Sequence, residues 1–263
     1  AVSHGRRTGY EGVRAAFSST SARWSPRIPE NHTVPTIDGI EGTGAPLPMA
    51  NLDTDQIMPK QFLRGVDRQS GLADGFLHDL RFSAPGVRRP DFVLNREPWA
   101  RASILVTGPN FGCGSSREHA VWGMRQLGLR CVIGSSFGGI FADNCARNGV
   151  PAIVIAQSQV ERLLALAADP ATCEMEVDLQ EQVIRTRGDG ASLRFDFDEL
   201  RRHMLLQGLD AVGLTMQSAD QIRSFEQNYL RDRPWVASAG SPASAEALTR
   251  PAESVSFDSV EEM

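Results

Sequence analysis

The chain has 263 residues, of which 41% are hydrophobic and 22% charged, and its formal net charge is −5. This composition supports a buried core in one large or two small domains, and the acidic balance argues against a general nucleic-acid binder. No uninterrupted run reaches the roughly 18 to 20 apolar residues that a membrane-spanning helix needs, so no membrane association is expected. The basic residues include a single lysine, Lys60, so lysine-dependent chemistry has one possible position.

Both ends of the chain differ in composition from its middle. Residues 1–36 are rich in Arg and Ser and poor in acids, which is typical of a disordered leader, a misplaced start site or an organelle transit peptide. Residues 237–263 lack a sustained apolar period and are predicted to be a disordered acidic tail. The folded body is expected over residues 37–236, in the cytoplasm unless the leader directs import into a mitochondrion or plastid.

Within the body, short apolar runs alternate with helical patterns. The predicted elements are strands at 104–106, 131–133 and 152–155, helices at 120–127, 141–147 and 157–168, an antiparallel pair at 173–179 and 182–187, and helices starting near Asp198 and Ser218. Strands that alternate with helices predict an α/β domain with a mainly parallel central sheet, flanking helices and some antiparallel additions.

The first cluster of polar residues lies at residues 51–63. Asp53 and Asp55 are separated by a threonine, which is typical of a turn whose carboxylates accept from backbone amides. The alternative, an EF-hand calcium loop, lacks the required glycine and terminal glutamate. Lys60 and Arg64 follow, so this segment could offer cations to an anionic substrate.

The most informative stretch is Gly-Pro-Asn-Phe-Gly-Cys-Gly-Ser-Ser-Arg-Glu-His, residues 108–119, between a predicted strand and a predicted helix. Ser115 or Ser116 suits the N-cap of that helix, and Glu118 fits a capping box with Ser115. The glycines allow backbone N–H groups to converge before the helix terminus, where the helix dipole favours an anion. A plain capped helix is the alternative interpretation.

A capped helix does not explain why Asn110, two adjacent serines and Arg117 stand within the same short loop. We therefore predict that this loop binds a carboxylate or phosphate, with Arg117 reinforcing the site. A P-loop is excluded because Gly114 is followed by serine rather than lysine. The dinucleotide fingerprint begins at Gly112 but has Arg117 in place of its third glycine, and the nucleophile elbow Gly-x-Ser-x-Gly does not occur.

The four cysteines form no Cys-x-x-Cys pair. They are Cys113, Cys131, Cys145 and Cys173. Neither a zinc ribbon nor a disulfide scaffold is predicted, and no ligand set for an iron–sulfur cluster is evident. A nucleophilic pair of Cys113 with His119 would lack an orienting partner.

A third cluster covers residues 135–151, where Asn148, Gly149 and Pro151 mark the end of a short helix. It predicts a second strand–loop–helix unit that could face the first.

Together the three clusters resemble the bacterial-type small subunits of 3-isopropylmalate dehydratase, the swivelling domain of the aconitase superfamily. The matching segments are residues 43–47 with 51–63, 110–119 and 135–151. The Gly-Ser-Ser-Arg-Glu-His run is shared with aconitase itself. The resemblance covers nearly all of residues 37–236 and implies a three-layer β/β/α swivelling domain; the two tails depart from the family pattern.

The resemblance implies a hydro-lyase of leucine biosynthesis, which isomerises 2-isopropylmalate to 3-isopropylmalate by dehydration and rehydration. This chain would be active only with a large subunit, in a heterodimer or higher assembly. A [4Fe-4S] cluster is expected on that partner, and no metal or cofactor on this chain. A related hydro-lyase subunit, for 2-methylmalate/citraconate or homoaconitate, and a non-catalytic anion-binding module are the alternatives.

By motif match, Ser115 would be the catalytic base that removes the proton next to a substrate carboxylate. The expected substrate-binding residues are Ser116, Arg117, Lys60 and Arg64. The residues expected to support the loops are Asn110, Gly112, Gly114, Glu118, His119, Asp53 and Asp55.

Overall fold

The computed structural model describes residues 36–64 and 71–238. The predicted leader at 1–36 therefore lies outside the described residues except for its last residue, and the predicted tail at 237–263 lies outside them except for its first two. The body contains one seven-stranded sheet and a separate two-stranded sheet.

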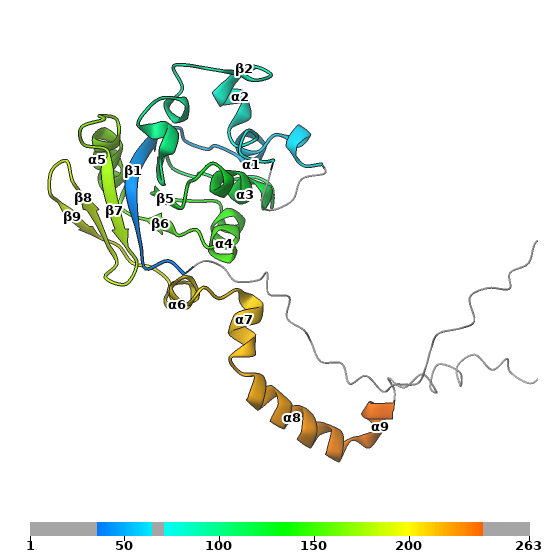
Figure 1. Cartoon of the computed structure of the whole chain (residues 1–263). Helices are drawn as coiled ribbons and strands as arrows, with labels where there is room; N and C mark the ends of the chain where they lie inside the picture. Colours follow the sequence, from blue (N-terminus) through cyan, green and yellow to red (C-terminus); the bar gives the residue numbers. More distant parts are fainter. Residues whose placement is uncertain (1–35, 65–70, 239–263) are drawn as a thin grey trace, which may run out of the picture. The chain divides into compact units, whose positions relative to one another are not determined.

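The large sheet joins a parallel half to an antiparallel half (Figure 1). In sheet order its strands are β6 (Ala152–Val154), β5 (Cys131–Gly134), β4 (Ile104–Thr107), β1 (Gly39–Leu47), β7 (Glu174–Asp178), β8 (Val183–Thr186) and β9 (Ser192–Arg194). Strands β1, β4, β5 and β6 pair in parallel, whereas β1–β7, β7–β8 and β8–β9 are antiparallel. Strands β2 (Phe82–Ala84) and β3 (Val87–Arg88) form the small sheet. The predicted α/β class, with a parallel sheet and antiparallel additions, is confirmed.

Strand β1 was not predicted, although it lies at the centre of the sheet. Its sequence contains three glycines and a proline, residue types that are depleted in strands. The strand divides its pairing: residues 39–43 pair with β7, and residues 44–47 pair with β4. Pro46 lies in the second part, where the β7 ladder has already ended, so one side of the strand needs no donor there.

Helices and short helical turns connect the strands. They are α1 (Thr54–Ile57), η2 (Lys60–Phe62), α2 (His78–Arg81), η3 (Val93–Asn95), η4 (Trp99–Arg101), α3 (His119–Gln126), α4 (Gly139–Arg147), α5 (Gln157–Ala167), α6 (Glu199–Gln207), α7 (Ala211–Met216), α8 (Ala219–Asp232) and α9 (Pro234–Ser238). The predicted helices over the middle of the chain, and those near Asp198 and Ser218, are confirmed.

The hydrophobic core occupies both faces of the parallel half. Leu105 on β4 packs with the cluster that includes α3 and α4, whereas its neighbours Ile104 and Val106 pack with the cluster that includes α5. Burial on both faces explains why β4 and β5 read as continuous apolar runs rather than as alternating ones. Residues of β7 and β8 belong to the same cluster as α5, so this helix is covered by strands of both halves.

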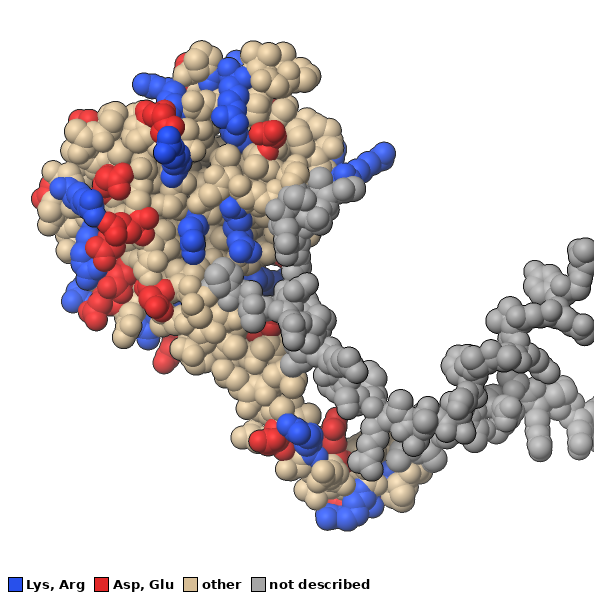
Figure 2. Space-filling model, viewed as in Figure 1, with Lys and Arg blue, Asp and Glu red and all other residues tan. Residues whose placement is uncertain are grey.

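The surface carries acidic and basic side chains in alternation rather than in separate patches on the face that Figure 2 presents. Arg185, for example, is 2.8 Å from Glu176 and 3.3 Å from Asp178. By contrast α8 exposes its apolar stripe: Phe225 is 66% accessible, and no described residue of that helix is buried.

Across residues 36–64 and 71–238, no helix is both long enough and apolar enough to cross a membrane.

Truncation of a core strand should measure how strongly the two-sided burial stabilises the sheet. Leu105→Ala is expected to lower the free energy of unfolding by about 2–5 kcal/mol, because it removes a fully buried side chain and leaves a cavity. Val87→Ala, at a position 54% exposed, is the matched control and should have little effect. Urea unfolding of the two variants checks this; equal losses would contradict the assignment of the core.

Candidate active site

Three loops lie together because three neighbouring strands are parallel. Residues 48–53 follow β1, residues 108–118 follow β4 and residues 135–138 follow β5. The carboxyl ends of parallel strands share one edge of a sheet, which is the usual place for a ligand in such folds. The three polar clusters of the sequence are thus brought to a single site.

Backbone hydrogen bonds hold these loops side by side. The first two loops are joined by Asn51 N–H to Pro109 O (2.9 Å), Gly112 N–H to Leu52 O (2.8 Å) and Thr54 N–H to Cys113 O (2.9 Å). The second and third are joined by Gly138 N–H to Phe111 O (2.9 Å) and Phe111 N–H to Ser136 O (3.3 Å). The loops therefore behave as short extensions of the sheet rather than as independent turns.

Asn51 and Asn110 give each loop the same unusual backbone. Both have φ of 57°, a left-handed conformation that asparagine tolerates better than most residues. The Nδ2 of Asn110 donates to Oδ1 of Asn51 at 2.9 Å, and its backbone N–H donates to Ser136 Oγ at 2.8 Å. Asn110 is thus the residue at which all three loops meet, which supports its predicted role.

Gly112 is required by close packing as well as by backbone conformation. Its φ is +75°, and a Cβ atom there would lie 2.2 Å from Cγ of Phe141 on α4. Gly114 also has a left-handed φ of +95°, but a Cβ there would find ordinary contact distances. Only the first of the two glycines therefore brings α4 against the loop.

The Ser115 side chain is exposed, and its hydroxyl is held on one side by a buried threonine. Ser115 Oγ lies 2.8 Å from Oγ1 of Thr54, and Ser115 N–H donates to the same oxygen at 3.0 Å. Thr54 is only 1% accessible. Sequence reasoning missed Thr54, although it stands between the two aspartates of the first cluster.

The predicted capping of α3 by Ser115 or Ser116 is wrong. The helix begins at His119, its N-cap is Glu118, and no side chain caps it. Ser115 bonds across to Thr54 instead of forward to the helix. Glu118 Oε1 accepts from Nδ2 of Asn148 at 2.8 Å and from Nε1 of Trp122 at 3.3 Å, so its carboxylate ties α3 to α4.

Arg117 turns back toward the first loop. Its Nη1 is 2.6 Å from Oδ1 of Asp55 and donates to the carbonyl of Met58 at 3.2 Å. Both contacts use the same nitrogen, so the rest of the guanidinium fork is available to another acceptor. The Arg117 side chain is 17% accessible and that of Asp55 is 51% accessible.

The remaining predicted residues have separate roles. Asp53 caps α1, because its carboxylate accepts from Gln56 N–H at 2.8 Å and its own N–H donates to Gln56 Oε1 at 3.1 Å; the turn interpretation of this segment is confirmed. Lys60 and Arg64 are exposed at and after η2, and no contact joins either one to the loops. His119 packs its ring 4.6 Å from that of Trp122.

Two asparagines on the inner side of α4 were also missed. Asn144 and Asn148 are 5% and 4% accessible; Asn144 Nδ2 donates to Ser116 O at 3.4 Å, and Asn148 bonds to Glu118. A buried amide in an otherwise apolar stripe is the sequence signal that could have identified them, because buried polar groups need partners.

The cysteines do not converge on a metal site. Three of them are buried, and burial raises the pKa of the Cys131 and Cys145 thiols above their usual range. Among the residues with a described placement, no group of three or more His, Cys, Asp or Glu could hold a metal ion. The donor set of these residues therefore does not fit an iron–sulfur cluster.

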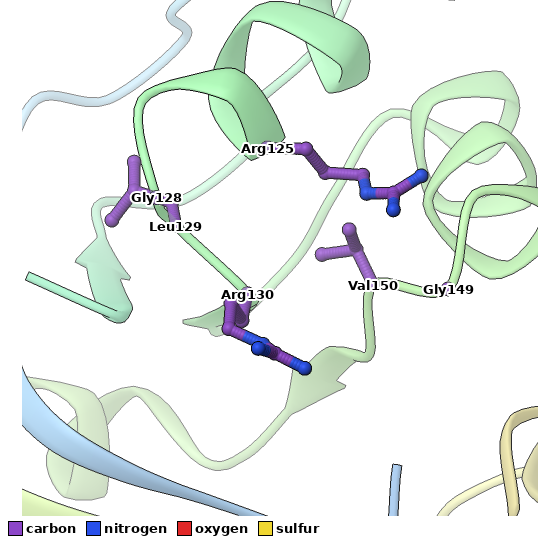
Figure 3. A pocket seen from close by; sticks show the side chains of 6 residues that line it. All are labelled: Arg125, Gly128, Leu129, Arg130, Gly149 and Val150. Atoms are coloured by element: carbon purple, nitrogen blue, oxygen red, sulfur yellow. The ribbon is translucent and has the colours of Figure 1, made fainter. Parts of the chain in front are cut away.

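A cavity of about 340 Å³ lies at the C-terminal end of α3 and is separate from the three loops. Figure 3 shows Arg125 and Arg130 extending beside Val150 along it. None of the predicted site residues lines it.

Comparison with known proteins agrees with this geometry. The model of the aconitase C-terminal domain matches residues 35–158, and models of the 3-isopropylmalate dehydratase small subunit match 161–199 and, for its C-terminal domain, 212–239. The small subunit 1 of 3-isopropylmalate dehydratase from Mannheimia succiniciproducens is 49% identical over 75% of this chain and 96% of its own length. That of Rhodospirillum rubrum is 47% identical over 75% and 94%.

A solved structure shows the same likeness. The crystal structure of 3-isopropylmalate dehydratase from Methanocaldococcus jannaschii superposes with a TM-score of 0.53 at 25% identity, over 71% of this chain and 99% of that one. The fold and its three loops define an aconitase-type C-terminal domain. More narrowly, the chain belongs to the family of 3-isopropylmalate dehydratase small subunits.

Adding one methyl group to the loop should separate its two requirements for glycine. Gly112→Ala is expected to cost about 2–5 kcal/mol of stability, from left-handed strain together with overpacking against Phe141. Gly86→Ala is the matched control: its φ is +74°, with no atom within 4 Å of a Cβ, so only the strain of about 1–2 kcal/mol applies. Equal losses in thermal or urea unfolding would contradict the close packing.

Thiol labelling should distinguish the site cysteine from the core cysteines. In the folded chain a maleimide is expected to modify Cys113 first, because its side chain is partly exposed while the other three are buried. Mass spectrometry of the labelled chain checks this, with Cys113→Ser as the control that should lose the fast reaction. Fast labelling at Cys131 or Cys145 would contradict the described core.

Proposed function

We propose that this chain is the small subunit of a 3-isopropylmalate dehydratase and that it supplies the proton-transfer residue, Ser115. The observation that carries the proposal is the exposed Ser115 hydroxyl, anchored by Thr54 in the loop that also carries Arg117. The names of the relatives support the assignment to this enzyme.

The reaction needs a base for a proton on the carbon next to a carboxylate. An unperturbed serine hydroxyl is far too weak an acid to serve as such a base, so its anionic form must be stabilised by neighbouring donors and charge. The site offers the hydroxyl of Thr54 at 2.8 Å and the guanidinium of Arg117 two residues along the chain. These groups are held in place before substrate arrives.

A substrate carboxylate would bind between Ser116 and Arg117. The Nη1 atom of Arg117 is fixed by Asp55 and Met58, which orients the planar fork while its other nitrogens remain available. Bidentate contact with a carboxylate is the geometry that such a fork suits best. Lys60 and Arg64 would add positive charge from the neighbouring segment.

The other half of the site would belong to a large subunit. The donor set described above does not fit a [4Fe-4S] cluster in this chain, so we place the cluster on the partner, where it would supply Lewis-acid chemistry. This chain would then be active only in the assembled enzyme. No step through the cluster is needed to assign the roles of Ser115 and Arg117.

The test reconstitutes the full chain with a cluster-bearing large subunit and assays it anaerobically with 2-isopropylmalate, 2-methylmalate and homoaconitate. Turnover of 2-isopropylmalate by the pair, and not by either chain alone, is expected. Activity of the isolated chain would overturn the division of labour. Preference for another substrate would assign the chain to a related hydro-lyase, and inorganic phosphate binding without turnover in any pairing would favour an anion-binding module.

Within that assay, Ser115→Ala should lower kcat by about 10²–10⁴-fold, because it removes the proton-transfer group. Ser83→Ala, in the small β2–β3 sheet away from the loops, is the matched control and should keep normal turnover. Co-purification with the large subunit shows that assembly is intact. Near-normal kcat in an assembled Ser115→Ala enzyme would contradict the role of Ser115.

A further inference from the structure

The Thr54 hydroxyl has an unusual position: it is buried, and both of its contacts are with one residue. Thr54 Oγ1 lies 2.8 Å from Ser115 Oγ and accepts from Ser115 N–H at 3.0 Å, whereas Thr54 itself is 1% accessible. A threonine hydroxyl has one proton to donate and two lone pairs that accept. The Ser115 N–H occupies one lone pair, so the question is where the proton points.

Burial decides the direction of the hydrogen bond between the two hydroxyls. Ser115 Oγ is the one acceptor within reach of the Thr54 proton among the described residues, and leaving a buried donor unpaired would cost free energy. Ser115 is exposed, so its own proton can point to solvent or substrate. Thr54 therefore donates and Ser115 accepts.

The geometry points to Thr54 as a positioning residue that keeps Ser115 oriented and stabilises its anionic form. The chain of donors runs from Ser115 N–H to Thr54 Oγ1, and from the Thr54 hydroxyl to Ser115 Oγ. Each bond polarises the next, which strengthens the second donation. Thr54 keeps its proton throughout and does not touch substrate. This inference rests on the proposed role of Ser115.

The fold makes this arrangement rigid. Thr54 is the first residue of α1, whose N-cap is Asp53, and the Thr54 N–H donates to the carbonyl of Cys113 at 2.9 Å. Its backbone is therefore fixed to the serine loop by one bond and its side chain by two. A short, capped helix thus acts as a support on which the serine rests.

The experiment compares Thr54→Val with Thr54→Ser in the reconstituted holoenzyme with 2-isopropylmalate. Valine keeps the shape of threonine but lacks the hydroxyl, so kcat should fall by about 100-fold while KM changes little, because one donor to a developing oxyanion is lost. Serine keeps the hydroxyl and should restore most of the turnover. A large rise in KM with unchanged kcat, or an equal fall in both variants, would overturn the inference.

A double variant separates positioning from a general structural effect. If Thr54 acts through Ser115, Thr54→Val should lower kcat no further in a Ser115→Ala background. Independent, multiplicative losses would overturn the inference. Thermal unfolding and co-purification with the large subunit control for folding, and Thr54→Ala supplies the same comparison if the valine variant does not assemble.

The same measurements keep the two proposals apart. Normal turnover in Ser115→Ala alone refutes the proposed function of the serine, whatever Thr54 does. A large loss in Ser115→Ala together with normal kcat in Thr54→Val refutes only the positioning role.

Discussion

The pairing of β1 is the constraint on which the rest of the structure depends. Its second half runs parallel to β4, and β4 runs parallel to β5, so all three chains leave the sheet at the same edge. Its first half pairs antiparallel with β7 and so joins the two halves of the sheet. Without this divided pairing, the loop with Thr54 and the loop with Ser115 would have no common edge at which to meet.

Bringing three loops together requires backbone conformations that ordinary residues avoid. Asn51 and Asn110 adopt left-handed φ values, and Gly112 lets the ring of Phe141 approach the chain. Such strained positions cluster at functional sites, where the surrounding structure over-determines them. The strain here is offset by the network of backbone bonds between the loops, which in turn leaves Ser115 and the outer part of the Arg117 guanidinium exposed.

Electrostatics at the site is distributed rather than concentrated in one buried charge. Asp55 neutralises part of Arg117 while orienting it, and the Glu118 carboxylate is spent on Asn148 and Trp122. Positive charge that faces solvent is thus limited to the unused part of Arg117 and to Lys60 and Arg64. That balance suits a small dicarboxylate, which would be released after turnover, better than permanent retention of a polyanion.

By itself the sequence determined the α/β class, most strands and helices, and the residue types of the serine loop, because apolar periodicity and turn residues are local properties. It could not identify β1, whose glycines and proline look unlike a strand until β4 and β7 are placed beside it. Nor could it show that Ser115 bonds to Thr54 rather than capping α3, because the two residues are distant in sequence. Tertiary structure decided that partnership, since only the parallel pairing of β1 with β4 places a buried hydroxyl beside the serine.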